Sequence, residues 1–320
     1  SMTSFAATGW QEEDGTWVYY NRAGEKVANS WEYSGDNRFY LDDAGNMATD
    51  SLIEDNDDYY YVDANGAMVR NRWVAIDNES AGEDNQPDVW WYYFQANGKA
   101  YKNSHASGTI FKRVINGKTY CFDEDGKMQY GWHFDEVDKH WYYLDSTTGV
   151  MLTGWQEING KWYYFSSDGL MQTGWIKDEG KWYYCLEDGV LVQENWLKVG
   201  ENYFFMRGTG ELAVGWRNMS GNWYYFKADG RCAFKWMKIG NDWYWMGTDG
   251  KMKTGWQQID GTWYYLNPVT PAPTWDWDAS QNRWVYGNRG GRPYGSMYAN
   301  EVTPDGYHVD ASGAWIRETP

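Results

Sequence analysis

The stretch that decides the fold runs from Gly154 to Trp175 and reads GWQEINGKWYYFSSDGLMQTGW. Its last two residues, Gly-Trp, repeat its first two, so the phrase ends by starting its own next copy. Within it, Trp162–Phe165 is an aromatic run of high β-strand propensity. Ser166–Gly169 has the composition of a tight turn, in which glycine supplies a positive φ. The pattern predicts a β-hairpin in which Leu170–Thr173 returns as a second short strand.

The phrase recurs along most of the chain in two registers. A hinge aromatic, the Trp of Gly-Trp, returns about every 20 to 21 residues, and a hairpin aromatic, which opens the Trp-Tyr-Tyr-Phe run, follows most hinges by about seven residues. The hinge positions are Trp10, Trp31, Leu52, Trp73, Phe111, Trp132, Trp155, Trp175, Trp196, Trp216, Trp236 and Trp256. The hairpin positions are Trp17, Tyr59, Trp162, Trp182, Tyr203, Trp223, Trp243 and Trp263, with Trp91 and Trp141 after longer loops. Two registers that agree in this way predict an all-β array of short hairpins, one per repeat.

The composition of the chain limits the classes of ligand that it can bind. Aromatic residues make up 20% of the 320 residues, with 24 Trp and 28 Tyr, so the core itself is expected to be aromatic. The net charge of −17 argues against binding to nucleic acid or to anionic lipid, and it fits a cationic ligand. No run approaches the roughly 18 apolar residues of a membrane span, so we expect no membrane insertion.

The chain divides by the regularity of its repeats. Residues 1–130 hold degenerate hairpin repeats with an acidic insertion at 77–88. Residues 131–267 hold nearly uniform repeats, in which we expect the functional sites. Residues 268–320 contain a proline-containing linker and a modified terminal hairpin that would cap the array. No signal peptide is visible, and we expect the chain to be part of a longer exported protein with a further domain.

Cysteine and histidine usage points away from metal or redox chemistry. Cys121, Cys185 and Cys232 each replace a packing residue of the repeat, so buried free thiols are expected rather than a disulfide or a metal site. Four histidines show no metal-ligand spacing: His105, His133, His140 and His308. Carboxylate pairs precede glycine and are typical of turns. We therefore expect no enzyme activity, no cofactor and no metal in this chain.

These residues resemble the choline-binding, or cell-wall-binding, repeat family of bacterial surface proteins and wall-lytic enzymes. The resemblance rests on Gly-Trp, a short polar turn, Trp-Tyr-Tyr-Phe, Asp-Gly and Met-x-Thr-Gly-Trp, and it covers about Trp10 to Leu266. It implies a left-handed β-solenoid with ligand sites between consecutive hairpins. Each implied site takes the hinge Trp and hairpin Trp of one copy and the first hairpin Tyr of the next.

Carried over position by position, the resemblance implies six sites. They consist of Trp132 and Trp141 with Tyr163; Trp155 and Trp162 with Tyr183; Trp175 and Trp182 with Phe204; Trp196 and Tyr203 with Tyr224; Trp216 and Trp223 with Tyr244; and Trp236 and Trp243 with Tyr264. Arg38 and Thr119 stand at hairpin positions and break their sites. Arg38 does so by adding a cation where a cationic ligand would sit.

The chemistry of the rings supports such a cage independently. The methyl groups of a quaternary ammonium cannot hydrogen-bond, so binding rests on apolar contact and on the negative faces of the rings, at about 2 kcal/mol per desolvated contact. Several weak sites on one array hold a polymer through avidity. The sequence thus favours a secreted, non-catalytic module at the cell wall or cell surface that binds choline-bearing or related wall polymers. A glucan- or other glycan-binding array is the alternative, and pure packing of the rings is a third interpretation.

Overall fold

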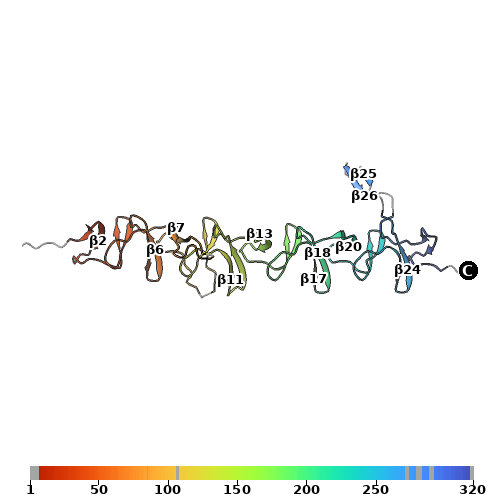
Figure 1. The fold of residues 1–320 in the computed structure, drawn as a ribbon, viewed down its shortest axis with the longest axis horizontal. Coiled ribbons are helices and arrows are strands. Elements are labelled where there is room, and N and C mark those ends of the chain that lie inside the picture. Colours follow the sequence, from red (N-terminus) through yellow and green to blue (C-terminus); the bar gives the residue numbers. More distant parts are fainter. Residues whose placement is uncertain are drawn as a thin grey trace, which may run out of the picture. The chain divides into compact units, whose positions relative to one another are not determined.

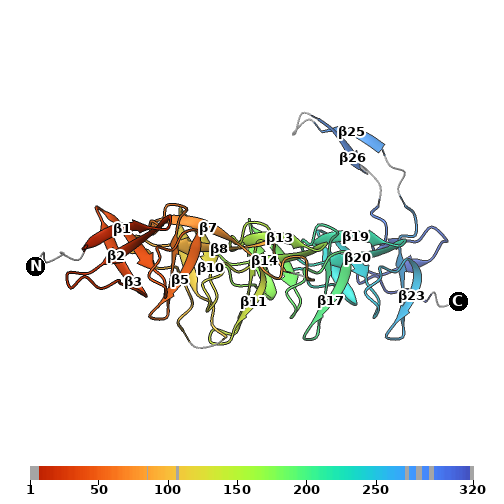
Figure 2. The ribbon, with the colours of Figure 1, turned by 60° about the vertical axis from the view of Figure 1, so that its left-hand side comes forward.

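The structure, a computed structural model, describes residues 7–84, 86–105, 108–270, 274–278, 283–287 and 292–317. These residues form two-stranded antiparallel sheets joined by turns and contain no helix, hence none that could span a membrane. The chain forms two compact units, residues 1–172 and 173–320. Within each unit the hairpins follow one another in sequence order (Figures 1 and 2). The predicted all-β hairpin repeat is confirmed.

Each unit has seven hairpins among the described residues. Those of the first are β1 (Gly9–Glu13) with β2 (Thr16–Tyr20), β3 (Ser30–Ser34) with β4 (Asn37–Leu41), β5 (Ser51–Asp55) with β6 (Asp58–Val62), β7 (Arg72–Asp77) with β8 (Val89–Phe94), β9 (Lys112–Ile115) with β10 (Lys118–Cys121), β11 (Gly131–Asp135) with β12 (His140–Leu144), and β13 (Gly154–Ile158) with β14 (Lys161–Phe165). Those of the second are β15 (Gly174–Asp178) with β16 (Lys181–Cys185), β17 (Asn195–Val199) with β18 (Asn202–Met206), β19 (Gly215–Met219) with β20 (Asn222–Phe226), β21 (Trp236–Ile239) with β22 (Asp242–Trp245), β23 (Gly255–Ile259) with β24 (Thr262–Leu266), β25 (Thr274–Asp278) with β26 (Arg283–Gly287), and β27 (Glu301–Val302) with β28 (His308–Val309).

The partner strand within each repeat differs from the prediction. The aromatic run of β14 pairs with the Gly-Trp segment of β13, around Asn159 (φ 51°) and Gly160 (φ 75°). Positive φ at both central residues defines the type I′ turn, whose twist matches that of the strands. Leu170–Thr173 is not a strand, because it adds only an isolated bridge from Met171 to Phe165. The prediction was wrong because Asn-Gly and Asp-Gly dipeptides both favour hairpin turns. In the structure the hairpin closes at Asn159-Gly160, the turn nearer to the aromatic run.

The segment after each hairpin joins that hairpin to the one before it. The N–H of Met171 donates to the carbonyl of Trp141 in the preceding hairpin, and the next N–H, of Gln172, donates to Tyr164 in its own hairpin, both at 2.8 Å. The same first bond recurs from Met47 to Trp17, Met68 to Arg38, Ala100 to Tyr59, Met128 to Trp91, Met151 to Thr119, Leu212 to Trp182, Cys232 to Tyr203, Met252 to Trp223, Met297 to Trp243 and Trp315 to Trp263. We call the donor of this bond the closing residue.

The core consists of small clusters, each shared by neighbouring hairpins. Around β13–β14, Ile158, Phe165 and Met171 are buried, and Trp132 and Tyr143 of the preceding hairpin pack against them. The last residue of most aromatic runs is fully buried, as with Phe94, Phe165 and Phe226. Repeats of this kind bury their apolar face only by stacking.

The cysteines lie in this core, as predicted. Cys121, Cys185 and Cys232 are all buried, and none forms a disulfide. Burial raises the pKa of the Cys121 thiol to about 12 and that of Cys232 to about 11. These thiols are packing residues.

The chain carries an insertion between Asn267 and Arg292, which leaves the stacking of the last hairpin, β27–β28, intact. The buried amide of Asn267 donates to the carbonyls of Arg292 and Pro293 at 2.9 and 3.1 Å, so it holds the two ends of the insertion together. Beyond it, Tyr298 N–H donates to the carbonyl of Tyr265, and β27–β28 follows β23–β24 as the next repeat. Much of the predicted linker lies outside the described residues, and the division of the chain by regularity stays a prediction.

Candidate functional site

Three aromatic rings and a closing residue meet between consecutive hairpins, and we call each such group a cage. Trp132 on β11 and Trp141 on β12 lie on the same face of their hairpin, with ring centroids 6.2 Å apart and planes at 86°. Tyr163 of the next hairpin lies 4.9 Å from Trp132 at 67°. The two indoles stand as nearly perpendicular walls, and the Tyr163 ring is inclined to the Trp132 ring.

The second unit repeats this geometry. The hinge and hairpin rings of Trp175 and Trp182, Trp216 and Trp223, and Trp236 and Trp243 lie 6.3, 6.3 and 6.5 Å apart, with planes at 81° to 88°. The third rings, Phe204, Tyr244 and Tyr264, lie 4.9 to 5.0 Å from their hinge rings. The structure therefore brings these predicted residues together as sets.

Two predicted sets differ from this pattern. Trp196 and Tyr224 are 5.1 Å apart, as in the other cages, but the smaller Tyr203 ring lies 5.9 Å from Phe234. Trp155 and Trp162 belong to the first unit and Tyr183 to the second, so the geometry of that set lies outside the description of either unit.

The fourth wall is the closing residue, which the sequence analysis did not include among the sites. The cavity at Trp175, Trp182 and Phe204 is about 430 Å³ and is also lined by Leu212. A thioether or aliphatic group there adds apolar contact without charge. Met171, for example, closes the cage of Trp132, which belongs to the hairpin before its own.

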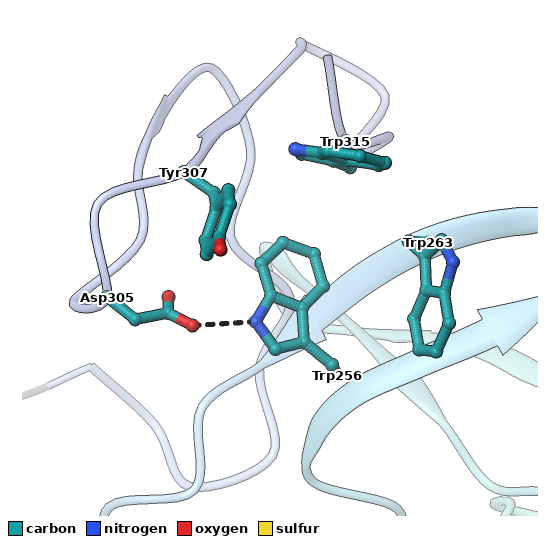
Figure 3. A pocket seen from close by; sticks show the side chains of 5 residues that line it. All are labelled: Trp256, Trp263, Asp305, Tyr307 and Trp315. Carbon is teal, nitrogen blue, oxygen red and sulfur yellow. Dashed lines mark hydrogen bonds between the residues drawn. The ribbon is translucent and has the colours of Figure 1, made fainter. Parts of the chain in front are cut away.

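Three further cages lie at positions where no site was predicted. Trp10, Trp17, Phe39 and Met47 line a cavity of about 240 Å³, and Trp73, Trp91, Tyr120 and Met128 line one of about 260 Å³. Trp256, Trp263, Tyr307 and Trp315, with Asp305, line one of about 400 Å³ (Figure 3). The two registers had already placed most of these tryptophans at hinge and hairpin positions. The restriction to uniform repeats excluded the first two, and the third was missed because its last rings, Tyr307 and Trp315, lie beyond residue 267.

In three irregular repeats a cation of the chain lies over a ring of the cage positions. The Arg38 guanidinium carbon is 4.9 Å from the centroid of Trp31. The ammonium of Lys102 is 5.3 Å from Tyr59, and that of Lys112 is 3.8 Å from Tyr142. These are cation–π distances. Each of these repeats lacks a Trp at the hairpin position. An internal cation also occurs in one two-indole cage, where the Lys177 ammonium is 5.7 Å from the centroid of Trp182.

The exposure of the rings indicates where a ligand can enter. Five hairpin tryptophans are between 40% and 45% exposed: Trp17, Trp141, Trp182, Trp243 and Trp263. The third ring lies deeper, since Tyr244 is only 5% exposed and burial raises its pKa to about 12. In the regular repeats the third ring is thus buried or half-buried and the hairpin indole is more open, whereas in the cage at Trp256 the third ring, Tyr307, is itself 48% exposed.

The charged groups beside one cage of the second unit compensate each other. Beside the cavity at Trp175, Asp229 forms an ion pair with Arg231 at 2.7 Å, so its charge is compensated. Within the described ranges, no cluster of three or more His, Cys, Asp or Glu side chains could hold a metal ion. The arrangement is suited to hold a small apolar or cationic group against π-faces.

Comparison with known proteins agrees with this architecture. A family model described as a choline-binding repeat matches residues 28–73, 112–153 and 152–196. A second, described as a cell wall binding repeat, matches residues 91–100, 214–232, 235–252 and 254–268. The chain belongs to the choline-binding, or cell-wall-binding, repeat family.

Solved structures show the same fold. Choline-binding protein F of Streptococcus pneumoniae, determined with a peptidoglycan analogue, is 24% identical with a TM-score of 0.56, over 97% of this chain and 100% of that one. The modular autolysin LytC of the same species, in complex with a synthetic peptidoglycan ligand, is 21% identical with a TM-score of 0.52, over 87% of this chain and 52% of that one.

A curated relative is similar to part of the chain. Glucosyltransferase-S of Streptococcus mutans is 33% identical over an alignment of 118 positions, and the match covers 30% of this chain. The matched segment is 7% of the length of that enzyme.

Proposed function

We propose that this chain is a non-catalytic module that holds an exported protein at the bacterial cell surface by binding choline groups of wall polymers in its cages. The observation that carries the proposal is the recurrence of one cage geometry, with two indoles nearly perpendicular and a third ring about 5 Å from the hinge indole. Similarity to choline-binding repeats supports this ligand.

The shape of a cage suits a quaternary ammonium. Such a group cannot donate hydrogen bonds, and it gains most where several ring faces surround it. Each cage is a weak site, since three rings at about 2 kcal/mol each must offset the cost of association. A row of weak sites on one chain binds a polymer that carries many copies of the ligand through a high effective concentration.

A glycan ligand is the second candidate, because a segment of the chain is similar to part of a glucosyltransferase. An exposed indole also stacks on a pyranose ring, and this contact requires no charge. Binding of choline therefore depends on the positive charge of the ligand, whereas binding of a glycan does not.

The test is calorimetric titration of the whole chain with choline and, in parallel, with a short α-glucan. We expect heat and a stoichiometry of several choline molecules per chain, and none with the glucan. Binding of the glucan without choline binding would replace the proposal by the glycan-binding alternative. An absence of binding by either ligand would leave a structural spacer.

A further inference from the structure

The cage nearest the C-terminus, which we call the terminal cage, differs from the others in composition. Its hinge and hairpin rings are Trp256 and Trp263 of β23–β24, and its third ring is Tyr307 of the turn between β27 and β28. Tyr307 lies 5.7 Å from Trp256 at 86° and 6.2 Å from Trp315 at 82°. Trp315 is the closing residue, so a fourth ring stands where Met, Leu, Ala or Cys stands elsewhere.

The terminal cage also has a carboxylate at its edge. The indole N–H of Trp256 donates to Oδ2 of Asp305 at 2.8 Å, and the Thr303 hydroxyl donates to Oδ1 at 2.6 Å. Figure 3 shows Asp305 on one side of Trp256 and Trp263 on the other, with the rings of the terminal hairpin beside them. The hydrogen bonds from Thr303 and Trp256 hold the pKa of Asp305 below its usual range, so the group is ionised near neutral pH.

This carboxylate is not compensated by a cation. Asp305 forms no ion pair among the described residues, whereas Asp229, which lines the cavity at Trp175, is paired with Arg231. No described Lys or Arg lies over the four rings of the terminal cage either. A full negative charge next to an aromatic cage attracts a cation more strongly than the rings alone can.

The first unit contains the same pair of groups with a cation in place. The indole N–H of Trp31 donates to Oδ2 of Asp55 at 3.1 Å, and the Arg38 guanidinium lies over that indole. A hinge indole that donates to a carboxylate therefore has an organic cation on its ring within this chain. At Trp256 the hairpin position is Trp263 instead of Arg, and no described side chain supplies a cation to that ring.

We propose that the terminal cage binds a small organic cation and that the charge of Asp305 makes it the most charge-selective cage of the second unit. The inference rests on the proposed function, and it adds a specificity-determining residue, Asp305. The expected ligand is a compact ammonium group, recognised by four rings and one carboxylate. A neutral group of the same shape fills the cavity but gains nothing from Asp305.

The test is ¹⁹F NMR of the whole chain labelled with 5-fluorotryptophan, in which Trp315→Phe identifies the Trp315 signal. That signal is followed during titration with choline and with its neutral isostere, 3,3-dimethylbutan-1-ol. In Asp305→Asn, which keeps an acceptor for the Trp256 N–H but loses the charge, we expect choline affinity at Trp315 to fall about tenfold. Affinity for the isostere should stay the same.

Two further variants separate charge from structure. Asp305→Glu keeps the charge and should retain most of the choline affinity, while Asp36→Asn makes the same change in net charge at an exposed turn and should have no effect. Unchanged choline affinity in Asp305→Asn would overturn the inference. The inference would also be overturned if choline shifted other tryptophan signals but not that of Trp315. That outcome would leave the proposed function standing. No response of any tryptophan to choline would contradict the proposed function itself.

Discussion

The guanidinium carbon of Arg38 lies 4.9 Å from the ring centroid of Trp31, at the position where other repeats place the hairpin tryptophan. The ring still has its neighbours, since Tyr60 of the next hairpin is 5.2 Å away. The cage is thus built, but one of its walls is an internal cation. Arg38 Nε is buried and has no hydrogen-bond partner, so the side chain is held there by the ring contact and by packing.

Replacement of this cation by an indole should open the cage. In Arg38→Trp we expect one additional choline per chain in calorimetry, because the variant has the ring set of the regular repeats. The backbone bond from Met68 to the carbonyl of residue 38 does not depend on the side chain. Arg38→Lys keeps a cation and is the matched control, with unchanged stoichiometry. An unchanged stoichiometry in Arg38→Trp would show that the cage is closed by something other than Arg38.

Loss of a hairpin indole should disable its own cage. Trp223→Leu keeps apolar volume but removes a wall 6.3 Å from Trp216, so choline should bind about 2 kcal/mol more weakly there, roughly thirtyfold. At choline concentrations that fill the other cages, the calorimetric stoichiometry falls by one. Trp90→Leu removes an indole outside the cages and should leave it unchanged. Melting curves of both variants check the fold, and equal loss in both would count against the cage.

Buried tyrosines predict loss of stability at alkaline pH. Burial raises the pKa of Tyr244 to about 12, against about 10 for an exposed phenol. Between these two values the unfolded chain releases the proton and the folded chain retains it. Stability is therefore complete below pH 10 and falls as the pH rises toward 12. Tyr244→Phe should flatten this decline in urea unfolding between pH 9 and 12. An equally steep decline in the variant would assign the effect to other groups.

The glycine of the Asp-Gly turn is required by stacking as well as by backbone conformation. Gly169 has a φ of 84°, and a Cβ on it would lie 2.5 Å from Sδ of Met151, the closing residue of an earlier repeat. Gly160 has a φ of 75° with nothing within 4 Å of the same position. In both alanine variants the free energy of unfolding should fall by about 1 kcal/mol or more because of backbone strain.

The comparison of the two variants isolates the contact. The free energy of unfolding of Gly169→Ala should be lower than that of Gly160→Ala by about 1 to 3 kcal/mol, because the close-packed Met151 side chain must move. Chemical denaturation measures both. Equal losses of unfolding free energy would show that the Met151 side chain can move away from the added methyl group with little loss of stability.

The sequence predicted the repeat and the fold class because these depend on periodic aromatic positions. It did not predict which segment pairs with the aromatic run, since two glycine turns flank that run and only the Asn159-Gly160 turn closes the hairpin. The closing residues were also missed. They come from the following repeat and reach the cage only through a backbone bond, such as that from Met171 to Trp141.

The terminal cage was missed for a different physical reason. Trp256 and Tyr307 are 51 positions apart, and the insertion between them hides the period. The hydrogen bonds of Asn267 across the ends of the insertion restore the stacking, but they leave no periodic trace in the sequence. The acidic partner Asp305 likewise belongs to a turn that the repeat pattern does not contain.

The most direct measurement is a crystal structure of the chain grown with choline at a concentration that saturates the calorimetric signal. We predict a quaternary nitrogen within about 6 Å of the ring centroids in cages with two indoles, such as that of Trp216, Trp223 and Tyr244. The repeat at Trp31, with Arg38 over the ring, should hold none. Empty two-indole cages, or choline located elsewhere on the surface, would contradict the account.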